Sequence, residues 1–363
     1  MLVAGSVVAQ DIPADDTRSL DACVAMESDA LRLACYDTVA GRDKRTPVQA
    51  DAAAERARQY QEQADRGRLN LFRSDPQTPT DQRVDAALAN AGKGSLLDSR
   101  WELARDSKLG LFNFRAYKPV YLFPVFWTAE TNTRPHSPNP DNTASEHSAL
   151  DRIEAKFQIS FKTKVVENLL GDNGDIWTAY TQSSRWQVYN GEESRPFRET
   201  SYEPEVMLAF RTGYSLLGWK GRLAAVGINH QSNGREDPYS RSWNRVVFNI
   251  GLDREGWALN LRPWIRISDG NDDDNPDISD YMGRGDATLV RVLPNGHQFS
   301  LGLRHSLRGG DRSHGAVQFD WAFPLLDSFR GHLQVFDGYG ESMIDYNHRT
   351  TYVGLGISLM EWY

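Results

Sequence analysis

Residues 257–267 read WALNLRPWIRI, a run in which apolar and polar side chains take turns. The odd positions are all apolar, whereas the even positions include Asn260, Arg262 and Arg266. Successive side chains of a β-strand point to opposite faces, so this run predicts a strand with one apolar and one polar face. Two arginines on one short strand are costly in a small packed core, but they suit the polar lumen of a barrel.

The same alternation recurs from about residue 111 to the end of the chain. Bacterial outer-membrane barrels have an even number of antiparallel strands. An all-β fold is therefore expected, a 12-stranded antiparallel transmembrane β-barrel over residues 106–363. The twelve expected strands are 112–127, 153–166, 175–189, 203–214, 221–232, 242–252, 256–267, 280–292, 296–306, 314–324, 329–339 and 350–363.

The connections between these segments tend to alternate in length, as short periplasmic turns and long outer loops would. A soluble β-sandwich is the alternative, but it would not alternate loop lengths so regularly. Residues 353–363 alternate and end on Tyr363, which resembles the C-terminal strand of outer-membrane proteins. The tight turns are 171–174, 253–255 and 293–295, and the longer polar loops are 128–152, 190–202, 233–241, 268–279 and 340–349.

Composition excludes two classes of protein. The 363 residues carry a net charge of −8, so no basic field argues for a nucleic-acid partner. No run of about 18 apolar residues exists, so no transmembrane helix is expected. Ten Trp, 14 Tyr and 29 Gly suit a barrel with aromatic girdles and tight turns.

The first 105 residues differ in composition from the rest. Residues 1–10 look like the tail of a secretory signal peptide, with a disordered start as the alternative. Residues 11–105 are rich in Ala and charged residues, and we expect a mostly helical or disordered periplasmic extension with a polar helix at 48–68. Cys23 and Cys35, the only cysteines, indicate one disulfide in an exported chain; two free buried thiols are the alternative.

Three residues of hydrolase chemistry stand among the aliphatic, lipid-facing positions of two neighbouring segments. His230 and Ser232 share the even positions of 221–232, and Asn244 has the same parity in 242–252. Side chains at i and i+2 lie roughly 7 Å apart on one face, and a neighbouring strand is about 5 Å away. His230 could therefore act as base for Ser232, with Asn244 fixing the imidazole tautomer. The alternative is a polar strand end that runs into a Ser-Asn-Gly turn.

A family resemblance supports the catalytic reading. Residues 229–245, NHQSNGREDPYSRSWNR, resemble the active-site signature of the bacterial outer membrane phospholipase A family. The resemblance covers about 110–363, and residues 11–105 are a longer extension than the family predicts. Further stretches that resemble the family are 180–183, 192–200, 273–277 and 340–347.

The resemblance implies a calcium-dependent phospholipase A1/A2 of the outer membrane. If the N-terminus is periplasmic, the loop after the fifth strand is extracellular and the active site faces the outer leaflet. The enzyme would hydrolyse acyl esters of membrane glycerophospholipids, and of lysophospholipids too, with Ser232 as nucleophile, His230 as base and Asn244 as orienting residue. Activity would require Ca²⁺ and a homodimer.

The resemblance also assigns metal and interface positions. The Ser240 hydroxyl, the Arg235 main-chain oxygen and, from the other subunit, Ser194 would hold calcium at the dimer interface. Asp237 and Asp274 match a second calcium site, and Gln182 matches a dimer-interface residue. An acidic surface loop is the alternative for residues 272–274.

Three other functions stay open at this point. A passive pore could use a lumen lined by polar side chains. A lipopolysaccharide deacylase is also a Ser–His barrel enzyme. Residues 11–105 could be a binding module anchored by the barrel. The lumen residues that would line the pore are Asn260, Arg262, Arg266 and Arg304.

Overall fold

The computed structural model divides the chain into two compact units. The first comprises residues 1–69 and 79–89, and the second comprises 70–78 and 90–363. In the first unit, Cys23 and Cys35 are buried and joined by a disulfide, which confirms the pairing expected from the sequence. The expected signal segment and the polar helix at 48–68 lie outside the described residues. The structure describes residues 95–104, 107–270, 272–325 and 329–363, together with Cys23, Val24, Arg32, Cys35, Tyr36 and Val39.

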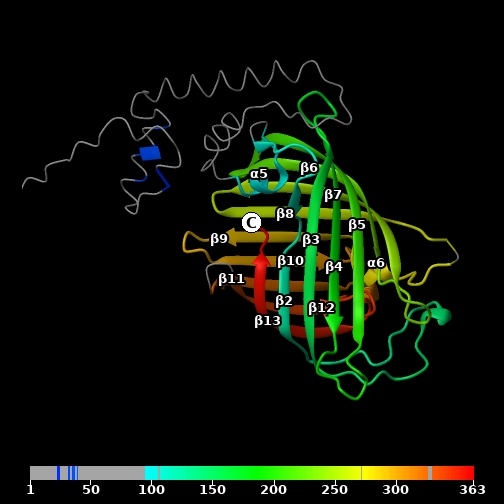
Figure 1. Cartoon of the computed structure of the whole chain (residues 1–363). Helices are drawn as coiled ribbons and strands as arrows, with labels where there is room; N and C mark the ends of the chain where they lie inside the picture. Colours follow the sequence, from blue (N-terminus) through cyan, green and yellow to red (C-terminus); the bar gives the residue numbers. More distant parts are fainter. Residues whose placement is uncertain are drawn as a thin grey trace, which may run out of the picture. The chain divides into compact units, whose positions relative to one another are not determined.

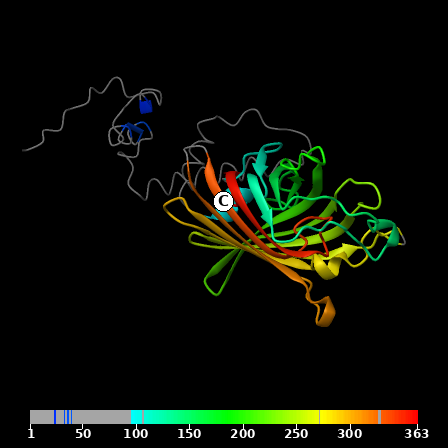
Figure 2. The same ribbon diagram turned by 90° about the horizontal axis from the view of Figure 1, so that it is seen from below.

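Thirteen strands in the described part of the chain form one antiparallel sheet that closes on itself (Figures 1 and 2). Strands β2 to β13 each pair with their neighbours in the chain, and β13 pairs back onto β2. The expected 12-stranded barrel is therefore confirmed. The strands are β1 (Phe114–Ala116), β2 (Val120–Thr128), β3 (Ile153–Val166), β4 (Asp175–Trp186), β5 (Phe197–Leu216), β6 (Trp219–Ser232), β7 (Ser242–Arg254), β8 (Trp257–Ile267), β9 (Gly285–Val292), β10 (Gln298–His305), β11 (Gly315–Pro324), β12 (Arg330–Tyr339) and β13 (Arg349–Met360).

The thirteenth strand comes from an interruption in the first expected segment. Strand β1 pairs only with β3, beyond the end of the β2–β3 ladder, so β1 and β2 share one place in the ring. Residues 117–119 separate them. The Lys118 N–H donates to the Ser160 hydroxyl instead of a strand carbonyl, and Pro119 has no N–H to donate.

Two boundaries differ most from the sequence expectation. The expected strand 280–292 begins only at Gly285, because residues before it form the short helix α6 (Ile278–Tyr281), whose apolar side packs on Trp243 and Trp264. The expected loop 190–202 is shorter, because β5 already begins at Phe197. Two short 3-10 helices, η3 (Pro140–Asn142) and η4 (Gly310–Arg312), lie in other connections.

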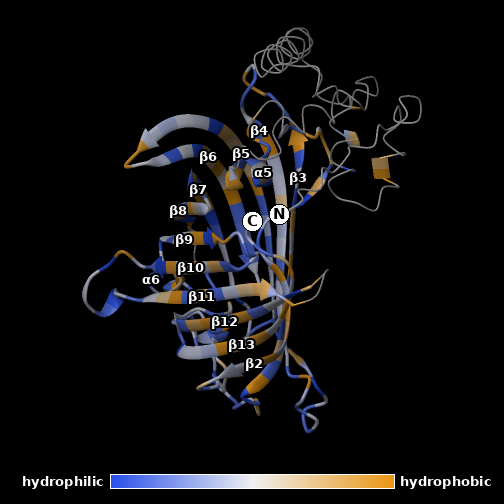
Figure 3. Cartoon of the chain, turned by 90° about the vertical axis from the view of Figure 1, so that its left-hand side faces the viewer, coloured by the Kyte–Doolittle hydropathy of each residue, from blue (hydrophilic) through white to orange (hydrophobic). Residues whose placement is uncertain are grey.

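The barrel is apolar outside and charged inside. Along β6 and β8 the outward positions include Ile228 and Ile265, which are 62% and 64% exposed. Polar and apolar residues alternate along the strands (Figure 3). Inside, Lys156 pairs with Glu341 at 2.7 Å. Such alternation matches a wall in contact with lipid and a polar interior.

Buried ion pairs and hydrogen bonds fill the interior. The residues that the pore alternative would place along an open channel each donate a hydrogen bond to a neighbouring group. The acceptors are the Tyr363 hydroxyl for Asn260, the Glu205 carboxylate for Arg262, the Asp273 carboxylate for Arg266 and the Tyr339 carbonyl for Arg304.

No helix among the described residues is long and apolar enough to cross a membrane.

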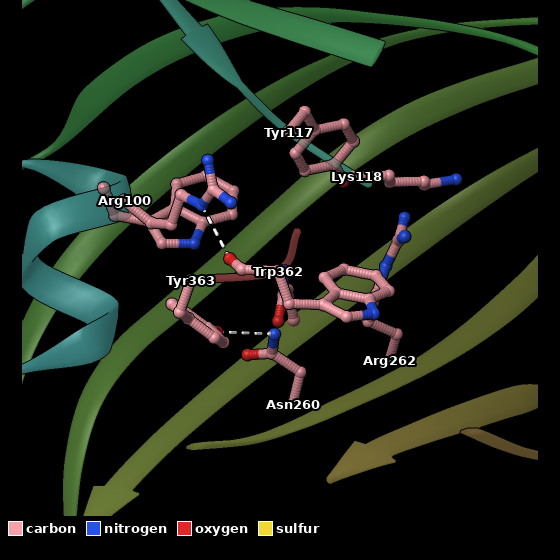
Figure 4. A pocket seen from close by; sticks show the side chains of 9 residues that line it. Arg100, Tyr117, Lys118, Asn260, Arg262, Trp362 and Tyr363 are labelled. Atoms are coloured by element: carbon pink, nitrogen blue, oxygen red, sulfur yellow. Dashed lines mark hydrogen bonds between the residues drawn. The ribbon is translucent and has the colours of Figure 1, made fainter. Parts of the chain in front are cut away.

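Helix α5 (Leu96–Trp101) packs inside the barrel at the end with the short turns. The Ser95 hydroxyl caps it by accepting from the Asp98 N–H, at 3.1 Å. Leu97 and Trp101 are buried in an apolar cluster with residues of β4, β5 and β6. The Arg100 Nε donates to the Trp362 carbonyl at 2.6 Å, which ties the helix to the C-terminus (Figure 4). The barrel unit therefore begins before residue 106.

Candidate active site

The site lies on the β6–β7 hairpin, at the end of the barrel opposite α5. The register places His230 directly across from Asn244. Both side chains lie on the outer wall of the barrel, on the same face as the exposed Ile228. The His230 Nδ1 and the Asn244 Oδ1 are 2.8 Å apart, so the structure brings this predicted pair into a hydrogen bond.

Ser232 follows His230 by two positions and points to the same face, half-buried. Its partners in the sheet are Tyr202 of β5 and Ser242 of β7. The turn begins only after it, since the buried Asn233 accepts from the Arg241 N–H at 3.0 Å. Turn chemistry therefore belongs to Asn233 and Gly234, and Ser232 remains on the regular strand, two positions from His230 on the same face.

The sequence did not indicate one contact of this group. The Asn244 Nδ2 donates to the Asp269 Oδ1 at 2.8 Å. Asp269 lies just beyond β8, whose last residue, Ile267, pairs with Asn244. Register reasoning could place residues 268–270 near the site, but a loop carries no period that tells where a side chain points.

Three of the expected calcium ligands gather in the loops above the hairpin. The Ser240 hydroxyl donates to the Asp274 Oδ2 at 2.7 Å. The Asn142 amide, which the sequence analysis missed, donates to the Asp237 Oδ1 at 2.7 Å and to the Ser240 carbonyl at 3.4 Å. Hydroxyl, carboxylate and carbonyl oxygens are the ligands of a hard cation, so the set fits calcium.

The other two expected positions, Arg235 and Ser194, make hydrogen bonds within their own surroundings. The Arg235 guanidinium donates to the Arg198 carbonyl at 2.7 Å and stacks over Tyr239. Ser194 lies in the β4–β5 connection, and its N–H donates to the Gly191 carbonyl. Within the described residues, no three His, Cys, Asp or Glu side chains are arranged to hold a metal ion.

A buried arginine supports the loop that carries Ser240. Arg241 is 0% exposed and donates to the Ser240 carbonyl at 2.6 Å and to the Asn142 carbonyl at 2.9 Å. Burial lowers the pKa of Arg241. Beside it, burial raises the pKa of Tyr346, whose hydroxyl donates to Asp277 at 2.6 Å. These bonds fix the β6–β7 loop against its neighbours.

Gln182 occupies an outward position on β4, where polar side chains are uncommon. Its Oε1 accepts from the Tyr180 hydroxyl at 3.0 Å, so two polar groups lie together on the lipid-facing wall.

Known proteins also match this chain over the barrel residues described above. The family model described as Phospholipase A1 matches residues 97–359. A Neisseria meningitidis protein named putative phospholipase A1 is 34% identical over 345 residues, covering 92% of this chain and 89% of its own. That share is larger than residues 106–363 can supply, so the likeness continues into the N-terminal extension.

Two solved structures are also similar. One is the outer membrane phospholipase dimer with bound calcium from Salmonella typhi, with TM-score 0.61, 34% identity, and coverage of 69% of this chain and 94% of that one. The other is an asparagine-to-alanine active-site mutant of outer membrane phospholipase A from Escherichia coli. Its TM-score is 0.64 at 33% identity, with coverage of 74% of this chain and 100% of that one.

Proposed function

Because the chain belongs to the phospholipase A1 family, we propose that it hydrolyses the acyl esters of membrane glycerophospholipids at the outer wall of its barrel. The observation that carries the proposal is the 2.8 Å contact between His230 Nδ1 and Asn244 Oδ1 on the apolar face that also holds Ser232. A nucleophile on the lipid side of a barrel suits a substrate that lies in the membrane. The E. coli neighbour described as an asparagine active-site mutant supports a role for Asn244.

The first half of the reaction acylates the enzyme. A serine hydroxyl is a weak nucleophile until a base removes its proton. The imidazole of His230 takes that proton as the Ser232 oxygen attacks the ester carbonyl carbon. The Asn244 carbonyl holds the Nδ1 proton and so keeps Nε2 free to act as the base.

The second half restores the serine. His230 gives its proton to the departing glycerol oxygen, and the lysophospholipid leaves. Water then attacks the acyl-enzyme, and His230 accepts the proton of that water. The fatty acid leaves as Ser232 regains its hydrogen, so His230 serves as base and acid in turn.

Calcium belongs to the same proposal. The Ser240 hydroxyl and the Arg235 main-chain oxygen would hold it with Ser194 of the partner subunit, and Asp237 and Asp274 would hold a second ion. A bound calcium supplies positive charge that stabilises the oxyanion of the tetrahedral intermediate. The calcium-bound dimer from S. typhi supports this part, as do the Ser240 hydroxyl and the Asp274 carboxylate, which lie 2.7 Å apart.

The barrel fold and the family relatives place the protein in the outer membrane. We place the long loops and the active site at the outer leaflet, and residues 11–105 in the periplasm. The outer leaflet normally holds lipopolysaccharide, so phospholipid substrate arrives there only when lipid asymmetry fails. The enzyme is then a dormant monomer that becomes an active dimer as misplaced phospholipid accumulates.

Release of fatty acid from mixed phospholipid–detergent micelles tests the proposal. Refolded protein is compared with and without calcium, and with Ser232→Ala. We expect calcium-dependent release that the substitution abolishes, because it removes the hydroxyl that would attack the ester. Folded, dimeric protein that releases no fatty acid would contradict the proposal. Preferred release from lipopolysaccharide would favour the deacylase alternative.

A further inference from the structure

We infer that Asp269 is a positioning residue of the catalytic group, acting through Asn244 on the tautomer of His230. This inference rests on the proposed function. A continuous line of hydrogen bonds carries it, from His230 Nδ1 to Asn244 Oδ1 at 2.8 Å, and from Asn244 Nδ2 to Asp269 Oδ1 at 2.8 Å. The half-buried Asp269 carboxylate lies at the end of this line, in the second residue after β8.

The carboxylate fixes which way the Asn244 amide faces. An ionised carboxylate can only accept hydrogen bonds, and the NH2 group of an amide can only donate them. The Asn244 NH2 must therefore face Asp269, which leaves Oδ1 toward His230. The opposite orientation would set the Asn244 carbonyl against the carboxylate and lose the hydrogen bond to Asp269.

The amide orientation in turn fixes the histidine. Oδ1 only accepts, so the Nδ1 that faces it carries the proton, and Nε2 is left with a free electron pair. A flipped amide would present NH2 to Nδ1 and place the imidazole proton on Nε2. That tautomer cannot take a proton from Ser232.

Asp269 also supplies a charge that the asparagine lacks. Hydrogen bonds in a chain polarise one another, so a carboxylate behind the amide strengthens the acceptor that faces His230. Asp269 thereby stabilises, through Asn244, the imidazolium that forms on His230 during the reaction. Asp269 itself is held in place from the lumen side, where its Oδ2 lies 3.7 Å from Arg266, which is anchored by two 2.6 Å bonds to Asp273.

A double-mutant cycle that exchanges the amide and the carboxylate between positions 244 and 269 tests the positioning role of Asp269. Asp269→Asn keeps the shape of the side chain but replaces a carboxylate, which only accepts hydrogen bonds, by an amide. We expect kcat to fall about tenfold with KM unchanged. Asn244→Asp alone should also lower kcat, because two carboxylates would then face each other across 2.8 Å. Combining the two substitutions should raise kcat above that of Asn244→Asp, because the new amide at 269 donates to the new carboxylate at 244. Asp272→Asn removes the same charge from an exposed position of the same loop and should leave kcat unchanged.

The outcomes separate the two proposals. A role in folding alone would make Asp269→Asn harmful in both backgrounds, so a double variant no better than Asn244→Asp overturns the positioning role. So does a wild-type kcat in Asp269→Asn. Wild-type protein that shows no Ser232-dependent release overturns the proposed function itself. The ¹⁵N shifts of the His230 ring, assigned with His230→Gln, give a readout without turnover, and Asp269→Asn should raise the fraction protonated at Nε2.

Discussion

The hydroxyl of Ser240 donates a hydrogen bond to the Asp274 Oδ2 at 2.7 Å. Its oxygen is a proposed calcium ligand. Ser240→Ala should raise the calcium concentration needed for half-maximal activity by about tenfold, the loss of one charge-assisted contact, while activity at saturating calcium persists. Calcium titrations of fatty acid release measure this. Ser313→Ala, in an exposed loop, is the control, and equal titrations for all three proteins would exclude Ser240 as a ligand.

Asp345 couples stability to pH. Burial opposes its charge, but Arg198 at 2.6 Å and the hydrogen bonds from Ser342 and Asn132 outweigh burial and lower its pKa from 3.8 to about 2. A lowered pKa stabilises the fold above the unfolded-state value and loses that contribution as the pH falls through about 2. Asp345→Asn should therefore cost about 2 kcal/mol at pH 7.

The difference between wild type and Asp345→Asn should shrink below pH 4, because the carboxyl of the unfolded chain takes up a proton at a higher pH than that of the folded chain. Urea unfolding in detergent at pH 7 and at pH 3 checks this. A difference that stays the same at both values would mean that the charge of Asp345 contributes nothing.

At this scale the sequence predicted the residues whose direction follows from strand parity. His230, Ser232 and Asn244 share a face because each lies at a regular strand position. Asn142 and Asp269 could not be found this way, since both lie in loops whose backbone has no period. Their contacts depend on how the loops fold over the hairpin.

Among the strands, the junction between β13 and β2 closes the barrel and leaves little room. A Cβ at Gly356 would lie 2.1 Å from the Leu122 carbonyl oxygen and 2.7 Å from the Phe123 Cα, both backbone atoms. Gly356→Ala should lower the free energy of unfolding by about 1–3 kcal/mol, since the two strands must separate to admit a methyl group.

Gly302 on β10 is the matched control for this substitution. Its added Cβ would meet only ordinary contacts, at 3.7 Å from the Gln318 Cβ. Gly302→Ala should leave unfolding in urea almost unchanged. Equal losses for the two variants would show that the closing junction is no tighter than the rest of the wall.

Helix α5 contributes to the barrel through its apolar side. Leu97 is 0% exposed, and Leu109, in the following segment, is 49% exposed. Leu97→Ala should cost about 3 kcal/mol because it leaves a cavity between the helix and the wall. Leu109→Ala should cost little. Urea unfolding of both variants measures the difference, and equal small effects would mean that α5 is not part of the cooperative barrel unit.

Elements with a strong period were predicted better than those without one. All twelve wall positions followed from alternation, because each strand has one face in lipid and one in the lumen. The predicted start of β9 was wrong, because Ile278 and Met282 lie in a helical turn that buries them against Trp243 and Trp264. Helix α5 is only six residues long, too short to leave a clear period in the sequence.

For the whole molecule, the proposed dimer makes activity depend on protein concentration. In the proposed dimer, the partner subunit would bring its Ser194 to the calcium site. Specific activity in detergent with calcium should therefore rise with protein concentration, and calcium should shift the sedimentation of the protein from monomer to dimer. Specific activity that is equal at all concentrations, from protein that sediments as a monomer, would contradict the dimer proposal.

Barrel architecture was predictable from the sequence because strand number and parity are local patterns. The filling of the lumen was not, since pairs such as Lys156 and Glu341 join residues nearly two hundred positions apart. Composition separated the N-terminal extension from the barrel, but it could not show that Ser95–Trp101 belongs with the wall. That contact depends on apolar residues of β4, β5 and β6 that pack against a helix outside the alternating strand pattern.

Ser232, the proposed nucleophile, points outward, so the relevant substrate concentration would be the one in the membrane and not the one in solution. Substrate reaches such a serine by lateral diffusion in a sheet of lipid, so the rate follows the number of phospholipids per unit area around the wall. Adding inert detergent at constant total phospholipid would slow turnover by surface dilution, although the amount per litre is unchanged. Each turnover also leaves a single-chain, cone-shaped product beside the protein, so the catalyst reshapes the medium from which it draws its next substrate.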